Sequence, residues 1–270
     1  MALELGRVLI TGASGFMGRH LIDFFDEQWV EYVRFQWDLL DKESIHAFFS
    51  KEKCTQIIHL VGTFEGELEK QISLNFMTTA NLLEVADIYG VRKVIFASSW
   101  AVYGEPIDAI SYETDVLSPN TLYGLSKKFA EDIILYYSRS RDFTSIILRF
   151  PNVYGEWSRG VIPSFLQSIR EKGRIILYGD GTQSRNFLHV SDAVRAFYLS
   201  LSQDTSDIYN ITNPIKTSLN ELIELLSTHL QFDVEKLPQT SNNLRDLLLS
   251  SERARLWLGF EALQKTILID

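Results

Sequence analysis

A tyrosine and a lysine stand four residues apart in the chain, at Tyr123 and Lys127. On a helix the two side chains share one face, so the ammonium group can lower the pKa of the phenol electrostatically. Such a phenol can give or take the proton of a hydroxyl or carbonyl group. Upstream, an apolar run that is typical of a strand ends in Ser98 and Ser99, where a hydroxyl can hydrogen-bond the same substrate oxygen. Together these groups predict proton transfer at a carbonyl or hydroxyl carbon, although a core-edge tyrosine and a surface lysine would give the same spacing.

A glycine-rich turn near the start of the chain indicates which kind of cofactor this chemistry would use. An apolar strand pattern at Val8–Thr11 leads into Gly12, Gly15 and Gly18, and a helical pattern follows. Glycine lets backbone N–H groups approach a pyrophosphate, and the helix N-terminus adds a favourable dipole. The pattern therefore favours a dinucleotide site over a plain turn with helix-packing glycines, and Lys127 would then also hold the nicotinamide ribose.

The sequence leaves the choice between NAD and NADP open. A carboxylate usually follows the second strand and binds the adenosine ribose, but none ends the strand pattern at Glu31–Gln36. Asp38 stands at a suitable distance along the chain, yet it starts the next segment. Arg34 and Arg19 could meet the 2′-phosphate of NADP, or could simply be solvated.

Short β-branched runs alternate with helical patterns over the first two-thirds of the chain, which predicts βαβ units with right-handed crossovers. The expected fold is an α/β, doubly wound parallel sheet of the Rossmann type. Residues 1–150 would form the dinucleotide-binding domain, and residues 151–270 mostly a smaller substrate-binding lobe, with a strand near 207–211 returning to the main sheet. The expected strands are Arg7–Thr11, Glu31–Gln36, Gln56–Leu60, Lys93–Ala97, Ser145–Leu148 and Asp207–Ile211. The expected helices are Gly15–Asp26, Lys42–Ser50, Gln71–Tyr89, Tyr123–Ser138, Val161–Lys172, Ser191–Ser202, Leu219–Leu230 and Glu252–Leu258.

Composition narrows the class of partner. The net charge is −9, with 35 acidic against 26 basic residues, which argues against nonspecific binding of nucleic acid. Cys54 is the only cysteine, so no intrachain disulfide can form, which fits a reducing cytoplasm. The N-terminal residues lack the pattern of a signal peptide, and no long apolar run predicts a membrane span. A cytoplasmic location without a membrane partner is expected.

Taken together, the motifs resemble the NAD-dependent epimerase/dehydratase family, the extended short-chain dehydrogenase/reductases, over nearly the whole chain. The family is an enzyme family that modifies nucleotide-linked sugars. The segments that carry the resemblance are Thr11–Gly18, Ile57–Leu60, Asn75, Asn81–Glu84, Phe96–Gly104, Tyr123–Lys127, Leu148–Gly155 and Tyr178–Asp192.

The resemblance implies a role for individual residues, an NAD or NADP cofactor and a nucleotide-diphosphate sugar as substrate. Ser99, Tyr123 and Lys127 would form the catalytic set, and no residue is assigned to a metal. His59 and His189 match positions that are mostly structural in the family. A homodimer through the helices around Gln71–Tyr89 and Tyr123–Ser138 is a further implication. The implied cofactor contacts are Gly12, Ser14, Gly15, Phe16, Met17, Gly18, Asp38 and Leu39 (against the adenine), Leu60, Val61, Gly62, Asn75, Tyr123 and Lys127. The implied substrate contacts are Ser99, Trp100, Asn152, Arg185 (on a pyrophosphate) and Arg245.

Departures from the family patterns narrow the reaction. Family 4,6-dehydratases follow the active hydroxyl with Asp-Glu, but here Trp100 and Ala101 follow it and cannot shuttle protons. The bifunctional GDP-sugar epimerase-reductases carry a cysteine and a histidine where this chain has Ala101 and Trp157. Hydride chemistry at one carbon, C4, remains.

The shortness of the chain favours one of the remaining reactions. The segment between the second expected strand and Trp37-Asp38 is also short. In this the chain resembles the 4-keto-6-deoxyhexose reductases of the family more than its epimerases, which favours the reductase. A nucleotide-sugar 4-epimerase that retains NAD is the alternative. A catalytically silent NAD(P)-binding redox sensor or scaffold is a third reading, against which the intact Ser99, Tyr123 and Lys127 argue.

Overall fold

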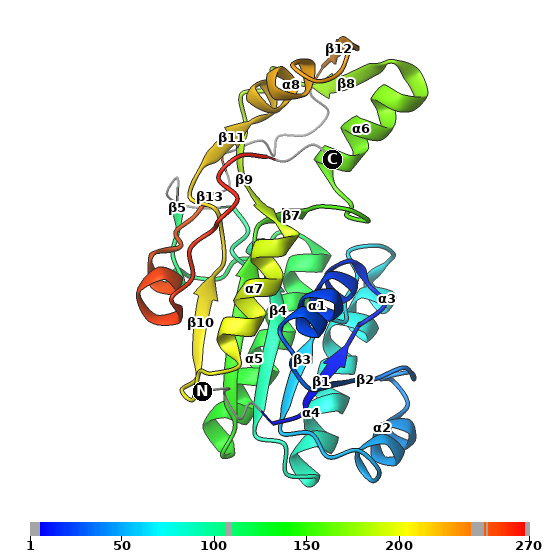
Figure 1. Ribbon diagram of the computed structural model, residues 1–270, viewed down its shortest axis with the longest axis vertical. Coiled ribbons are helices and arrows are strands. Elements are labelled where there is room, and N and C mark those ends of the chain that lie inside the picture. Colours follow the sequence, from blue (N-terminus) through cyan, green and yellow to red (C-terminus); the bar gives the residue numbers. More distant parts are fainter. Residues whose placement is uncertain (1–5, 106–109, 239–245, 247, 268–270) are drawn as a thin grey trace.

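The computed structural model describes residues 6–105, 110–238, 246 and 248–267, and it is built around a six-stranded sheet (Figure 1). The strand order is β10-β6-β4-β3-β1-β2, and every neighbouring pair is parallel. The prediction of a doubly wound parallel α/β sheet is confirmed, and a C-terminal strand returns to its edge as expected. The strands are β1 (Val8–Thr11), β2 (Tyr32–Arg34), β3 (Gln56–His59), β4 (Lys93–Ser99), β6 (Thr144–Phe150) and β10 (Asp207–Asn210).

Helices cover both faces of this sheet (Figure 1), so its strands are apolar on both sides. Successive residues of β1 show the alternation: Ile10 packs in a cluster with α1 (Phe16–Glu27) and α7 (Val190–Ser200). Leu9 packs on the opposite face, in a cluster with three other helices. These are α2 (Lys42–Phe49), α4 (Thr78–Ile88) and α5 (Leu122–Ser140). No helix in the described ranges is long and apolar enough to cross a bilayer.

The helix expected over Gln71–Tyr89 is interrupted. It begins earlier, as α3 (Leu68–Ile72), passes through a π-helical turn at Ser73–Met77, and continues as α4. Two threonine hydroxyls donate to backbone carbonyls at this turn, Thr78 to Leu74 at 2.8 Å and Thr79 to Asn75 at 2.9 Å. Such turns are common at functional sites, and this one directs the side chain of Asn75 toward the end of the sheet.

The C-terminal part contains more strand than the sequence indicated. One small sheet has the order β11-β9-β7, and β8 pairs with β12 and β5 with β13. Helices α6 and α8 pack against these strands around a separate apolar cluster, beyond the carboxyl ends of the main strands (Figure 1). The bounds are β5 (Ile110–Ser111), β7 (Asn152–Tyr154), α6 (Val161–Lys172), β8 (Arg174–Tyr178), β9 (Ser184–His189), β11 (Lys216–Ser218), α8 (Leu219–Ser227), β12 (Asp233–Leu237) and β13 (Leu248–Leu249). The helix expected at Glu252–Leu258 contains a π-helical turn at Ala254–Leu258.

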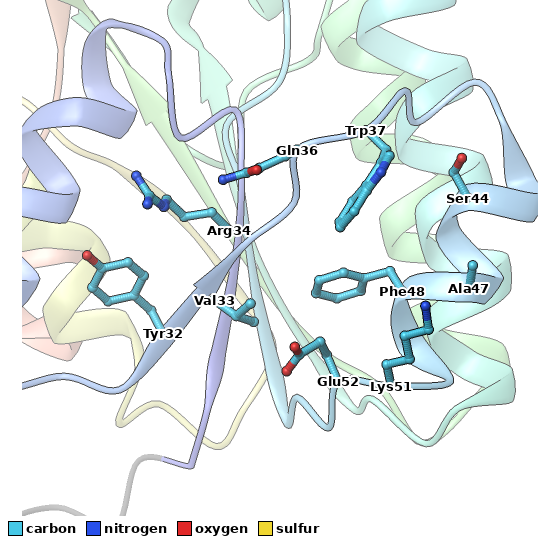
Figure 2. Close-up of a pocket in the computed structure, with 10 residues that line it drawn as sticks. All are labelled: Tyr32, Val33, Arg34, Gln36, Trp37, Ser44, Ala47, Phe48, Lys51 and Glu52. Carbon is cyan, nitrogen blue, oxygen red and sulfur yellow. The ribbon is translucent and has the colours of Figure 1, made fainter.

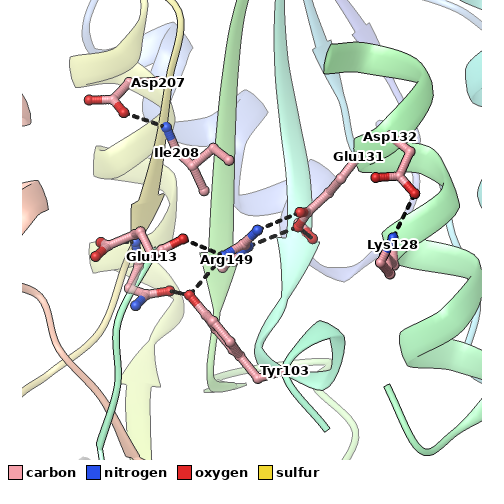
Figure 3. A network of polar contacts seen from close by, with 10 residues as sticks. Tyr103, Glu113, Lys128, Glu131, Asp132, Arg149, Asp207 and Ile208 are labelled. Carbon is pink, nitrogen blue, oxygen red and sulfur yellow. Dashed lines mark hydrogen bonds and ion pairs between the residues drawn. The ribbon is translucent and has the colours of Figure 1, made fainter. Parts of the chain in front are cut away.

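A buried ion pair ties β6 to α5 (Figure 3). Both side chains of the pair, Arg149 and Glu131, are at most 2% exposed and lie 2.7 Å apart at their closest atoms. Arg149 also donates to the hydroxyl of Tyr103 at 2.9 Å, and that hydroxyl donates to Asn210 on β10 at 2.7 Å. The second carboxylate oxygen of Glu131 accepts from Ser98 on β4. The network therefore fixes α5 relative to β4, β6 and β10.

Replacing one partner of this pair should destabilise the fold more than replacing both. Arg149→Leu leaves the Glu131 carboxylate buried without its cation, and we expect a loss of about 3–5 kcal/mol in the free energy of unfolding. Urea denaturation measures this loss, with the exposed Arg170→Leu as the matched control. The double variant Glu131→Leu/Arg149→Leu should recover part of the loss. A single variant as stable as the control would contradict the structural role of the pair.

Candidate active site

The carboxyl end of β4 meets the first turn of α5, and this meeting brings Ser99 to Tyr123. Ser99 is the last residue of β4, and its hydroxyl is hydrogen-bonded to the phenol of Tyr123. Helix α5 is capped by Thr121, whose hydroxyl accepts from the backbone N–H of Gly124 at 3.0 Å. A Cβ on Gly124 would collide with the carbonyl of Ala101, so glycine is needed for this close approach. Sequence order and helix start together place the serine and the phenol in contact.

Lys127 lies one turn further along α5 and is almost completely buried, at 3% exposed. Its ammonium group donates to the carbonyl of Ala97 at 3.0 Å and lies 4.6 Å from the ring centre of Phe96. Burial lowers the pKa of Lys127 to about 8, and the nearby Glu131 carboxylate opposes this shift. Lys127 therefore holds its proton less tightly than an exposed lysine does.

The phenol itself departs from the expectation that Lys127 lowers its pKa. Burial raises the pKa of Tyr123, and the hydrogen bond with Ser99 only partly opposes the rise. Removal of the phenol from water penalises the phenolate more than its neighbours stabilise it. The expected direction was wrong, because the raised pKa of Tyr123 favours the neutral phenol.

A second layer behind these groups is rigid and neutral. The ring nitrogens of buried His59 contact the hydroxyls of Thr11 at 2.6 Å and Thr79 at 2.9 Å. The Thr79 hydroxyl already donates to a carbonyl, so it accepts from Nε2 of His59, and Nδ1 accepts from Thr11. Burial, with Lys127 nearby, lowers the pKa of His59 to about 3. His59 is thus a neutral structural histidine, which agrees with its expected role.

The glycine-rich turn has the shape that a pyrophosphate needs. Gly12 adopts φ +74°, and a Cβ there would press on the backbone of Leu60 and Val61. A Cβ on Gly18 would collide with the backbone of Gly12, so this glycine lets α1 start against the sheet. At Gly15 a Cβ would meet only the carbonyl of Gly12, at 3.2 Å, and its other side is open to a ligand. Gly15 also caps α1 without a side-chain hydrogen bond, which leaves first-turn N–H groups for an anion.

The loop after β3 continues this surface toward Lys127. A Cβ on Gly62 would lie 2.8 Å from the Lys127 ammonium and 2.9 Å from the amide oxygen of Asn75. Asn75 holds the loop in place, because its side chain exchanges hydrogen bonds with the backbone of Thr63 at 2.6 and 2.8 Å. It also donates to Ser126 on α5 at 2.7 Å. The described residues of both loops therefore fit a dinucleotide that runs from the glycine turn to Lys127.

A pocket of about 600 Å³ lies farther out, between the edge strand β2 and helix α2 (Figure 2). The adenine contacts were expected at Asp38 and Leu39, which directly follow the lining residue Trp37 in the chain. The Asp38 carboxylate accepts from the N–H of Leu40 at 2.8 Å within its own turn, and the side chain of Leu39 is buried in the core. Trp37 is 59% exposed and packs edge-on against Phe35. Its ring is therefore an exposed flat surface in the lining of the pocket.

The residues expected to contact the sugar substrate come from several elements. Trp100 starts a 3₁₀ turn directly after Ser99, and Asn152 starts β7. Arg185 on β9 is half-buried and donates to the carbonyl of Ser184 at 2.8 Å. Burial lowers its pKa, and Asp246 opposes the shift. Arg245 lies outside the described residues.

Contacts of the loop after β7 with α1 and with the loop after β3 were not expected from the sequence. Trp157 follows β7 with φ +63°, and its ring lies 5.2 Å from the guanidinium of Arg19 and from the ring of His20, both on α1. The neighbouring Arg159 forms an ion pair with Glu65 in the loop after β3. The sequence did not indicate a left-handed backbone at Trp157, because glycine normally occupies such positions.

Comparison with known proteins gives the context for this geometry. Residues 8–212 match the model of the NAD dependent epimerase/dehydratase family. The chain is 31% identical to a dTDP-4-dehydro-6-deoxyglucose reductase of Escherichia coli, and the alignment covers 97% of this chain and 94% of that protein. It is 30% identical to a putative UDP-glucose 4-epimerase of Methanocaldococcus jannaschii, over 85% of this chain and 84% of that protein. The solved structure of MoeE5 in complex with UDP-glucuronic acid and NAD has a TM-score of 0.84 and 27% identity, with 95% and 94% of the two chains covered.

The buried lysine should make stability depend on pH in an unusual direction. The folded-state pKa of Lys127, about 8, lies below the unfolded value, so between these values the unfolded chain binds more protons. Stability should therefore rise as the pH rises through this window, on the order of 3 kcal/mol in total relative to Lys127→Met. Urea denaturation of both proteins between about pH 7 and about pH 11 measures the difference. A constant difference across this window would refute the buried, strained charge.

Proposed function

Because the chain belongs to the NAD-dependent epimerase/dehydratase family, we propose that it reduces a nucleotide-linked 4-keto-6-deoxyhexose at C4, with NAD or NADP as its cofactor. The observation that carries the proposal is the half-buried Tyr123 phenol, hydrogen-bonded to Ser99 and one helical turn before the buried Lys127. A reductase needs a proton donor at the carbonyl oxygen, and a phenol whose pKa is raised keeps its proton until it is required.

Three residues of the chain have separate roles at the reacting carbon. A bound nicotinamide supplies the hydride. Ser99 holds the carbonyl oxygen of the sugar by a hydrogen bond, and Tyr123 gives its proton to that oxygen as C4 is reduced, which leaves an alcohol. Lys127, whose pKa of about 8 allows proton exchange near neutral pH, stabilises the phenolate and restores its proton.

Two further observations support reduction over the other family reactions. Trp100 and Ala101 occupy the positions after the active hydroxyl, and Ala101 is buried with its N–H directed to Ser99 at 3.3 Å. Neither side chain can act as the acid or base that removal of water requires. The Escherichia coli reductase also aligns with more of this chain than the archaeal epimerase does. The epimerase remains the second candidate, because both reactions use the same three residues.

The lobe beyond β6 and an α4–α5 surface complete the proposal. Asn152 and Arg185 would contact the sugar and the pyrophosphate, since a guanidinium pairs phosphate oxygens through its fork.

Met77, Phe129 and Tyr136 are exposed apolar side chains on or beside the paired helices α4 and α5. Such a surface supports a homodimer built through these helices.

A direct assay separates the candidates. Purified protein with dTDP-4-keto-6-deoxyglucose and NADPH should consume the cofactor and release a sugar alcohol, and Tyr123→Phe should lower turnover by about 10²–10⁴-fold. The same variant should still bind the cofactor, because the glycine turn and Lys127 are intact.

The alternatives give different results in this assay. Interconversion of UDP-glucose and UDP-galactose with tightly retained NAD, and no net consumption of cofactor, would favour the epimerase. Cofactor binding with no turnover of any related keto sugar, unchanged by Tyr123→Phe, would favour the silent sensor and overturn the proposal.

A further inference from the structure

The carboxyl end of β2 presents a positive charge where a dinucleotide-binding sheet usually carries a carboxylate. The residues that follow the strand are Phe35, which is buried, and Gln36, which is exposed and uncharged. Asp38, the nearest carboxylate along the chain, is turned back to the N–H of Leu40. No described carboxylate is therefore directed at the position where an adenosine ribose hydroxyl would be bound.

Arg34 is available at this position. It is exposed, ends β2 opposite Ile10 of β1, and lines the pocket between β2 and α2. Figure 2 shows its side chain and the amide of Gln36 reaching to the same side of the strand, away from Trp37 and Phe48. Among the described residues it has no ion-pair partner, because Arg7 takes the neighbouring carboxylates of Glu31 and Glu52.

Asp23 and Asp26 of α1 also act on Tyr32 of this strand, and Asp26 is engaged by it. Tyr32 donates a hydrogen bond to Asp26 at 2.9 Å, and Arg34 acts on Tyr32 only electrostatically. An unpaired guanidinium next to an amide donor offers charge and hydrogen bonds to a phosphate monoester. A ribose hydroxyl is bound better by a carboxylate, which accepts its hydrogen bond.

Arg19 was the second candidate for this role in the sequence, and the structure separates the two. The Nε of Arg19 donates to the carbonyl of Ser14 at 2.9 Å, and its guanidinium lies over the ring of Trp157. These contacts engage Arg19 with the glycine-rich turn and with the loop after β7, whereas Arg34 forms no ion pair among the described residues.

We propose that Arg34, assisted by Gln36, binds the 2′-phosphate of the adenosine moiety, so that the chain selects NADP(H) over NAD(H). The proposal rests on the dinucleotide site of the proposed function and adds its selectivity.

Binding of adenosine fragments tests this without turnover. The probes are adenosine 2′,5′-bisphosphate and 5′-AMP, with affinities measured by calorimetry and supported by thermal shift. Wild type should prefer the bisphosphate by at least about tenfold, which corresponds to about 1.4 kcal/mol. Arg34→Gln should remove most of this preference and leave 5′-AMP binding unchanged. Gln36→Asp should reverse it, because a carboxylate repels the phosphate and accepts from the ribose hydroxyl.

Control variants test whether the effect is specific to Arg34. Arg170→Gln removes an exposed arginine of α6 and should not change the preference by much. Arg19→Gln should leave the ratio of the two affinities as it is. Equal affinities in wild type, or an Arg34→Gln variant with the wild-type ratio, would overturn the assignment of Arg34 while leaving the dinucleotide site standing. Failure of both fragments and of both whole dinucleotides to bind would instead overturn the proposed function.

Discussion

The contact between the end of β4 and the start of α5 is the constraint on which the rest of the site depends. The Ser99–Tyr123 hydrogen bond forms there only because Gly124 lets the helix approach the carbonyl of Ala101. The same helix carries Lys127 into the interior, where Ala97 accepts its hydrogen bond. One packing contact thus sets the position of the serine, the phenol and the ammonium group together.

Holding a cation in this place requires support from the surrounding core. The Arg149–Glu131 pair clamps α5 to the sheet, and the Glu131 carboxylate partly offsets the cost of burying Lys127. His59 stays neutral, so it adds no second positive charge beside the lysine. The apolar strand pattern that makes the sheet stable is therefore also what tunes the proton affinities of the site, because burial is the largest cause of each shift.

Much of the fold was predictable, because local patterns determine it. The alternation of strand and helix specified the parallel sheet, and the β1 turn and the Tyr123–Lys127 spacing indicated the two halves of the candidate site. What could not be predicted depends on tertiary packing. The phenol pKa was expected to fall, but spacing says nothing about how much water is excluded. The strands of the lobe, such as β9, lack the alternation that marks isolated strands, and nothing in the sequence paired Arg149 with Glu131.

The central claim is that Tyr123 and a nicotinamide act on the same sugar carbon from one rigid site. The most direct measurement is isotopic: the keto sugar is reduced with NADPH that carries deuterium at its transferable position, and the product is analysed by NMR and mass spectrometry. The account predicts one deuterium, located at C4 with a single configuration, and almost no labelled product with Tyr123→Phe. Product that forms without deuterium at C4, or equal labelling in the variant, would contradict it.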